Sequence, residues 1–321
     1  MRFSLRLNND LSLGRYRELA AAAERAGFDQ LWVSHDLFLR SAPVLVSAMA
    51  AVTRRISLGI GIFNPYTQNP AEIAMTAATL DELTGGRFVL GLGAGAADFL
   101  EWVGIEQHRP LATVAEAMAG IRSLLAGERR GERYLRFAAR RVTPIYLGAM
   151  GPRMLELAGR EADGVLPLLF PPEHLDTVRA LVERGVAERS SELPELDLAA
   201  CIWLSLAQDA RAARRPLAEK IAYYGHSLGP LILERLGLER ADFEPVHRAL
   251  HRDRDLDRAV SLVDERMLAM GIWGDLPVVV SRLEALIRAG ARHLSFGPPL
   301  GPDPLRAIEL LGAEVLPALR R

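Results

Sequence analysis

Residues 56–95 read ISLGIGIFNPYTQNPAEIAMTAATLDELTGGRFVLGLGAG and contain two apolar runs with an amphipathic segment between them. The apolar runs, 56–62 and 87–92, have the length and composition of buried strands. Segment 70–83 begins with a proline and is closed by two glycines, as helices commonly are. A strand, a helix and a second strand in this order form the unit from which parallel sheets are built.

The same alternation extends outward in both directions through most of the 321 residues. Eight strands with helices between them predict an α/β fold, namely a (β/α)8 TIM barrel in a single domain of residues 1–321. The alternation breaks in 208–274, a mostly helical and charged stretch, so we expect a helical insertion there after strand 7. The predicted strands are 2–7, 30–34, 56–62, 87–92, 144–147, 164–168, 198–206 and 292–296.

The composition excludes several classes of protein. The 39 Lys and Arg residues are balanced by 40 Asp and Glu, so there is no basic surplus to neutralise nucleic-acid phosphates. The single cysteine, Cys201, stands among apolar residues, which favours a buried packing thiol over a disulfide or a metal ligand. The N-terminus lacks the apolar core of a signal peptide, and the longest apolar run, 42–52, is too short to span a bilayer. We therefore expect a cytoplasmic protein with neither nucleic acid nor membrane as a partner.

In a barrel of this kind the active site lies at the carboxyl ends of the strands, so the residues after each strand are the candidates for chemistry. Ser34-His35-Asp36 follows the second predicted strand. A His beside an Asp at this position is able to exchange protons or to orient a cofactor, which makes both of them candidate catalytic residues. The alternative is that His35 and Asp36 cap the next helix.

Glycines mark the ends of the third and fourth strands. Gly61 stands inside an apolar strand, which indicates a bulge or a close approach of the backbone to a ligand. Asn64 precedes a proline and is expected to be extended, with its amide directed into the barrel mouth or used in a plain turn. Residues 91–96 match the dinucleotide pattern G-x-G-x-x-A, but the acidic residue required about 20 positions later falls in a predicted helix. We interpret these glycines as a strand end that a flat ring or a phosphate can approach.

The fifth strand is followed by Gly148-Ala149-Met150-Gly151-Pro152, which opens directly into a helix. Small residues expose backbone N–H groups, and the start of a helix carries the positive end of its dipole. A generic strand-to-helix turn would have the same composition. Of all the segments in the chain, this one best predicts an anion-binding site.

No spacing of His or Cys predicts a metal site. His247 and His251 share a predicted helix face, but Arg248 stands where a zinc-protease motif has Glu. A solvated helix face is the better interpretation of these two histidines, and we expect no metal in this protein. No P-loop motif is present.

Several motifs, taken together and in order, point to a known group of enzymes. They are residues 64–70 (NPYTQNP), 79–87 (TLDELTGGR), 90–95 (LGLGAG), 144–159 (PIYLGAMGPRMLELAG), 162–165 (ADGV) and 296–304 (FGPPLGPDP). With them the chain resembles the luciferase-like flavin and deazaflavin (coenzyme F420) oxidoreductase superfamily, and within it the methylenetetrahydromethanopterin reductase-like branch. The resemblance extends from about residue 1 to residue 317 and fades in 208–250.

This resemblance implies a barrel, usually dimeric, that binds FMN or coenzyme F420 at the carboxyl ends of its strands. It further implies that the cofactor ring leans on a bulge with a non-proline cis peptide, which by motif position is Gly61–Ile62. The reductase branch usually has Asp-His where this chain has His35-Asp36, so which of the two faces the ring is left open. The implied cofactor-binding residues are Gly61, Ile62, Asn64, Gly93, Gly95, Ala96, Gly148, Ala149, Met150 and Gly151.

The leading functional prediction is an oxidoreductase that transfers a hydride between coenzyme F420 and a small organic substrate. An FMN-dependent luciferase-like monooxygenase and a non-catalytic flavin-binding relative are the alternatives. Some deazaflavin dehydrogenases of the family carry Glu just past the strand-four glycines, where this chain has Ala96 and Ala97. That departure makes a glucose-phosphate dehydrogenase a less favoured prediction.

Two further predictions concern substrate and partners. Tyr224, His226 and Trp273 fall in the predicted insertion and are candidates for lining the substrate pocket, with ordinary packing as the alternative. The helical segments 42–52 and 71–83 are unusually apolar for solvent-facing helices. They are therefore the candidate surface of a homodimer.

Overall fold

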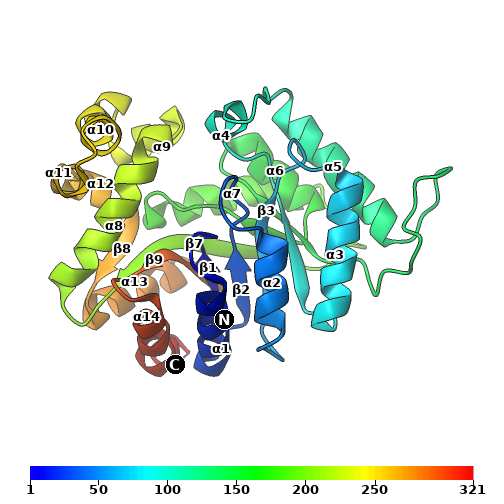
Figure 1. Cartoon of the computed structure of the whole chain (residues 1–321), viewed down its shortest axis with the longest axis horizontal. Coiled ribbons are helices and arrows are strands. Elements are labelled where there is room, and N and C mark those ends of the chain that lie inside the picture. The colour runs from blue at the N-terminus through cyan, green and yellow to red at the C-terminus, as the bar shows by residue number, and fades with distance from the viewer. Residues whose placement is uncertain (321) are drawn as a thin grey trace. The chain divides into compact units, whose positions relative to one another are not determined.

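The computed structural model describes residues 1–320, and strands and helices alternate along them as the sequence predicts (Figure 1). All eight predicted strands are present, and the last of them extends further than expected, to Leu300. The strands are β1 (Arg2–Leu7), β2 (Gln30–Val33), β3 (Ser57–Phe63), β4 (Phe88–Leu92), β5 (Ile145–Gly148), β6 (Gly164–Leu166), β7 (Asp197–Leu206), β8 (Gly271–Gly274) and β9 (His293–Leu300).

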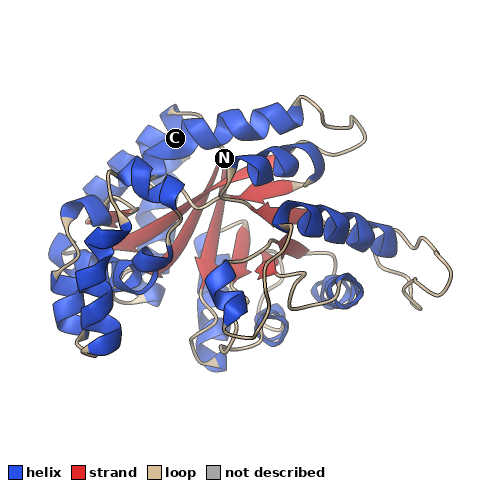
Figure 2. Cartoon of the chain, turned by 90° about the horizontal axis from the view of Figure 1, so that it is seen from above, coloured by secondary structure: helices blue, strands red, loops and turns tan. Residues whose placement is uncertain are grey.

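The strands hydrogen-bond in the order β6-β5-β4-β3-β2-β1-β9-β7-β8, and β6 pairs with β7 as well. Pairing from β1 through β6 is parallel, with Leu31 of β2 opposite both Leu5 and Leu58. The pairing of β6 with β7, which sets Gly164 opposite Asp197, closes the ring. The predicted α/β fold, a (β/α)8 barrel, is confirmed, and its strands can be followed in red in Figure 2.

The chain gathers into two compact units, one of residues 4–167 and 178–199 and the other of residues 1–3, 168–177 and 200–321. We call them the first and the second unit in the order given. Organisation as a single domain remains a prediction. The helices are α1 (Leu13–Ala26), α2 (Ala42–Ala50), α3 (Pro70–Thr84), α4 (Ala97–Glu101), α5 (Pro110–Leu125), α6 (Pro152–Glu161), α7 (Leu175–Val186), α8 (Ala210–Tyr224), α9 (Pro230–Leu236), α10 (Arg240–His247), α11 (Leu256–Ser261), α12 (Glu265–Leu268), α13 (Leu276–Arg288), α14 (Pro304–Leu310) and α15 (Leu316–Leu319).

Local chemistry sets the ends of the helices that hold the site. Asn69 caps the start of helix α3, and its side-chain oxygen accepts a hydrogen bond of 2.9 Å from the N–H of Ala71. It ends at Gly85, which has a φ of 69° and donates its N–H to Glu82. Helix α1 ends in the same way at Gly27, with a φ of 84°. The glycine stop expected after segment 70–83 is therefore confirmed.

Two elements differ from the sequence prediction. The predicted insertion 208–274 is helical from α8 to α12 but ends in the strand β8, which pairs with the last residues of β7 from Trp203 to Leu206. Trp273 consequently lies on a strand and not in a helical insertion. The sequence GIWG has two glycines and too few residues to show an alternation, so it carried no strand signal. The short helix α4, after the glycines of β4, was also not expected.

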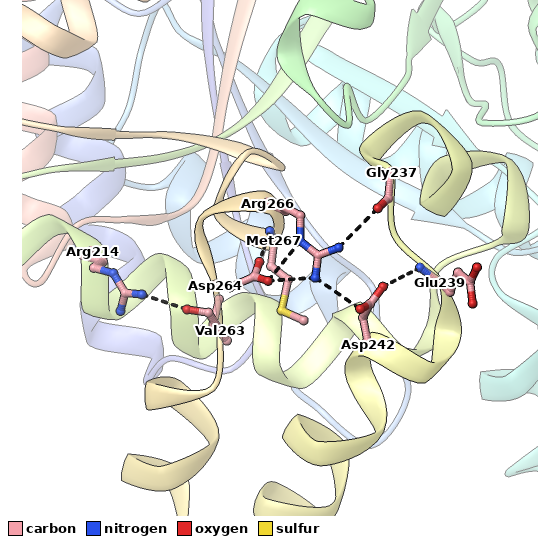
Figure 3. A network of polar contacts seen from close by, with 8 residues as sticks. All are labelled: Arg214, Gly237, Glu239, Asp242, Val263, Asp264, Arg266 and Met267. Atoms are coloured by element: carbon pink, nitrogen blue, oxygen red, sulfur yellow. Dashed lines mark hydrogen bonds and ion pairs between the residues drawn. The ribbon is translucent and has the colours of Figure 1, made fainter.

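A polar network in the second unit ties the inserted helices together (Figure 3). Arg266 pairs with Asp242 of α10 at 3.2 Å and with Asp264 at 3.0 Å. Arg214 of α8 donates to the carbonyl oxygen of Val263 at 2.7 Å. These groups are partly exposed, so the network sets the geometry of the helices more than it adds to the free energy of unfolding.

Candidate functional site

The end of β3 is irregular, as the sequence predicted. The pairing of β3 with β4 shifts register between Ile60 and Phe63, and the peptide bond Gly61–Ile62 between them is cis. Both the bulge and the cis bond expected at this position are therefore confirmed. Gly91 of β4 has to be a glycine here, because a Cβ atom on it would lie 2.4 Å from the carbonyl oxygen of Ile60.

The side chain of Ile62 lies over the ends of two neighbouring strands. A Cβ atom on Gly93, after β4, would lie 2.7 Å from Ile62 Cδ1, and one on Gly148 of β5 would lie 3.0 Å from Ile62 Cγ2. These two glycines therefore leave room for Ile62, which forms an apolar floor across the ends of β3, β4 and β5. Gly59 has a different role, because a Cβ atom there would collide with the Trp32 ring at 2.3 Å.

Asn64 holds the loop after β4 in place. Its Nδ2 donates to the carbonyl oxygen of Ala94 at 3.0 Å, and its Oδ1 accepts from the N–H of Tyr66 at 2.9 Å. Gln107 donates to the same carbonyl of Ala94 at 2.9 Å. Gly95 lies against the Asn64 amide with a φ of 68°, so a side chain there would be strained and crowded. The polar contact of Asn64 that the structure displays is thus with the protein backbone, and contact with a cofactor remains a prediction.

His35 lies in the loop after β2 and contacts two other elements. Its Nδ1 accepts a hydrogen bond of 3.2 Å from the N–H of Ala42 at the start of α2, and its ring meets Phe63 edge-on with centroids 5.3 Å apart. Burial lowers the pKa of His35, so the ring is neutral at pH 7. The neighbouring Asp36 is half-buried, and its carbonyl oxygen accepts from Asn9 Nδ2 at 3.0 Å. His35 therefore does bond the start of the next helix, as the alternative interpretation held.

The segment after β5 leads into α6. Ala149 is buried and Met150 half-buried, whereas Gly151 is exposed and no atom would lie within 4 Å of a Cβ on it. Pro152 starts the helix and has no N–H, and it is followed by the exposed Arg153. A cation in the first turn is disfavoured by the helix dipole unless an anion binds beside it. This geometry fits the anion-binding site predicted here, and Arg153 is a basic residue that the prediction did not include.

The three candidate substrate residues belong to the second unit. The centroid of the Tyr224 ring lies 6.0 Å from that of Trp203, and the Lys220 ammonium lies 4.1 Å from the centroid of the Tyr224 ring. His226 stacks on His247 at 4.2 Å, and its Nε2 lies 3.4 Å from Glu244. These contacts give Tyr224 and His226 a packing role, and Trp273 lies on β8. Their contact with substrate remains a prediction.

Sequence reasoning missed two features of the loop after β2 and its contacts. Gln68, after β3, brings its Nε2 to within 3.5 Å of His35 Nε2, while its Oε1 is buried without a hydrogen-bond partner among residues 1–320. Phe38 is 73% exposed and lies 6.4 Å from the ring of Trp102, itself 58% exposed. Phe38 also has a φ of 64°, a conformation that is costly for a bulky side chain. Nothing in the composition of these loops indicated contacts between residues so far apart in sequence.

Within residues 1–320, no group of three or more His, Cys, Asp or Glu residues is placed to hold a metal ion. No helix in that range is both long and apolar enough to cross a membrane.

The residues at the ends of β3, β4 and β5 fit a flat cofactor with an anionic arm. Ile62 supplies an apolar surface for a ring, and the backbone at Gly151 is bare of side chains that would block an approach. The unpartnered oxygen of Gln68 marks a buried polar position that a ligand could satisfy.

Comparison with known proteins agrees with this geometry. The luciferase-like monooxygenase family matches residues 1–293, so the chain belongs to that family. It is 31% identical to the 5,10-methylenetetrahydromethanopterin reductase of Archaeoglobus fulgidus, with both chains covered completely. It is also 31% identical to the F420-dependent glucose-6-phosphate dehydrogenase of Nakamurella multipartita, with 94% of this chain and 91% of the relative covered.

A solved structure extends the likeness to three dimensions. The coenzyme F420-dependent tetrahydromethanopterin reductase of Methanopyrus kandleri superposes with a TM-score of 0.88 at 31% identity, over 99% of each chain. The resemblance to the methylenetetrahydromethanopterin reductase-like branch is thereby confirmed. The chain is an oxidoreductase of the luciferase-like family.

Proposed function

We propose that this protein uses coenzyme F420 to transfer a hydride to or from a small organic substrate. The observation that carries the proposal is the apolar floor of Ile62, set between the glycine-lined ends of β4 and β5. Full-length relatives that carry F420 dependence in their names support it. The bound deazaflavin would supply the hydride chemistry, and the protein would supply orientation and electrostatics.

In this proposal the chain holds the coenzyme mainly through its backbone. Ile62 supports the flat ring, with Gly61 and Asn64 shaping the loop beneath it. N–H groups around Gly95 and Ala96, and those of Gly148–Gly151 at the start of α6, face the anionic arm. His35 and Asp36 lie in the loop after β2 and are proposed to act near the ring edge. Tyr224, His226 and Trp273 are retained as the proposed contacts to substrate.

A titration of the purified protein with coenzyme F420 and with FMN tests the choice of cofactor. We expect the dissociation constant for F420 to be the smaller of the two. A dissociation constant for FMN more than tenfold below that for F420 would overturn the choice of F420 and favour the alternative, an FMN-dependent luciferase-like monooxygenase. Tight binding of F420 without hydride exchange to any donor or acceptor tested would point to a non-catalytic binder.

Arg153→Glu tests where the anionic arm lies. Reversal of this charge at the start of α6 should weaken F420 binding about tenfold or more, because an anion there gains from both the helix dipole and the guanidinium. Arg17→Glu in α1 makes the same change of charge at another exposed position and serves as the control. Equal affinities for the two variants would place the arm elsewhere.

A further inference from the structure

The N–H of Ala42 determines where the proton of His35 lies. This backbone N–H points at His35 Nδ1 over 3.2 Å. A backbone amide only donates, so Nδ1 must present its lone pair, and the neutral ring then carries its proton on Nε2. The positive end of α2 at this point also opposes a second proton on the ring. His35 is therefore a hydrogen-bond donor through Nε2.

Gln68 is the side chain that meets this donor. Its Nε2 lies 3.5 Å from His35 Nε2, and two N–H groups that face each other do not bond. Its Oε1, buried within residues 1–320, has no hydrogen-bond partner there. Rotation of the amide by 180° brings Oε1 opposite the His35 N–H and satisfies both groups. The same rotation moves the Gln68 NH2 group into the buried position that has no partner.

We propose that Gln68 is a positioning residue that fixes the orientation and tautomer of His35 and donates its own NH2 group to an acceptor oxygen of the bound ligand. The chain of hydrogen bonds runs from Ala42 N–H to His35 Nδ1, from His35 Nε2 to Gln68 Oε1, and from Gln68 Nε2 to the ligand. The last of these hydrogen bonds rests on the proposed function, in which the acceptor oxygen belongs to the bound coenzyme. A buried NH2 group without an acceptor is unfavourable, so the acceptor has to come with the ligand.

This arrangement assigns different roles to the two neighbouring residues after β2. Both ring nitrogens of His35 are engaged, Nδ1 by the backbone and Nε2 by Gln68. His35 therefore orients and does not take up a proton during the reaction. Of the two candidate catalytic residues in this loop, Asp36 is then the one left to exchange a proton.

The first test uses the protein without coenzyme, labelled with nitrogen-15 in its histidine rings. At pH 7 and pH 8 the spectrum should contain one neutral ring with a pyridine-like Nδ1 and a pyrrole-like Nε2, and this ring should be missing in His35→Gln. In Gln68→Glu a carboxylate replaces the amide and should increase the proton affinity of His35 about tenfold or more. Asn69→Asp adds the same charge one residue further at an exposed helix cap and should leave His35 unchanged. An Nδ1–H tautomer in the wild type, or an unaltered titration of His35 in Gln68→Glu, would overturn the proposal.

The second test measures coenzyme F420 affinity, for example by its fluorescence. Gln68→Leu keeps the bulk of the side chain but removes the donor, and it should raise the dissociation constant at least tenfold, with Asn69→Asp as control. An unchanged constant in Gln68→Leu would overturn the ligand step. Failure of the wild type to bind F420 would reject the proposed function, whereas the nitrogen-15 experiment would still decide the role of Gln68 toward His35.

Discussion

At the scale of single residues, Gly95 offers a sharp test of the loop after β4. Gly95→Ala would force a side chain into a φ of 68°, and its Cβ would lie 2.6 Å from Asn64 Nδ2. The conformation alone costs about 1–2 kcal/mol, and the displaced amide would release Ala94. Gly104→Ala has a nearly equal φ of 72° and open space around it, so it isolates the conformational cost. We expect Gly95→Ala to lower the free energy of unfolding more than Gly104→Ala and to weaken F420 binding. Urea denaturation and a coenzyme titration of both variants measure this, and equal effects would contradict it.

The residues around Gly95 also show where sequence reasoning ends. The glycines at the strand ends could be predicted to mark a site, but the cause of each one lies in a distant residue. Gly59 is required by Trp32, and Gly93 by Ile62. The contact of Gln68 with His35 joins loops after two different strands. Such contacts depend on how the strands are placed side by side, which no local pattern encodes.

At the scale of elements, Asp81 of α3 pairs with Arg141 in the segment before β5. Arg141 Nη2 lies 3.0 Å from Asp81 Oδ1 and also donates to the carbonyl oxygen of Phe88. The Asp81 side chain is 1% exposed, whereas that of Arg141 is 38% exposed. Loss of Arg141 would therefore leave a buried charge without its partner, whereas loss of Asp81 would leave a partly exposed charge.

Removal of the arginine should be the more damaging change to this pair. Arg141→Met would leave a buried carboxylate without its cation and should cost about 3–5 kcal/mol of stability. Asp81→Asn would leave an arginine that can turn to water, and should cost about 1 kcal/mol. Urea denaturation of the two variants should show this difference, and a smaller loss for Arg141→Met would show that water reaches Asp81.

Elements with a regular pattern could be predicted, and irregular ones could not. The start of helix α6 was expected, because Pro152 follows a turn of small residues and fits the first position of a helix. Strand β8 depends on hydrogen bonds to the end of β7, because its own four residues have little preference for a strand. Helix α4 likewise follows a glycine-rich turn and is only five residues long.

At the scale of the whole molecule, the balanced charge and the proposed ligand are compatible. A chain with a formal net charge of −1 has no general attraction for anions. The groups proposed to face the anionic arm are backbone N–H donors at strand and helix ends, which act over short distances and add nothing to the net charge. The near-neutral composition therefore argues against nucleic acid as a partner and is compatible with a phosphate-bearing coenzyme.

The homodimer expected from the family remains a prediction, and α2 and α3 supply its candidate surface. These helices pack against each other in the first unit and expose Val44, Met75 and Leu83, each about half accessible to solvent. An apolar surface of this kind is stabilised when a second copy covers it. Light scattering of the wild type at micromolar concentration should therefore give the mass of a dimer.

Val44→Asp would place a charge in that interface and should shift the protein to a monomer, because burial of an unpaired carboxylate is costly. Val278→Asp in α13 changes another exposed valine, in the second unit, and should leave the dimer intact. A wild-type monomer would remove the dimer from consideration. A dimer that persists in Val44→Asp but dissociates in Val278→Asp would place the interface on the second unit.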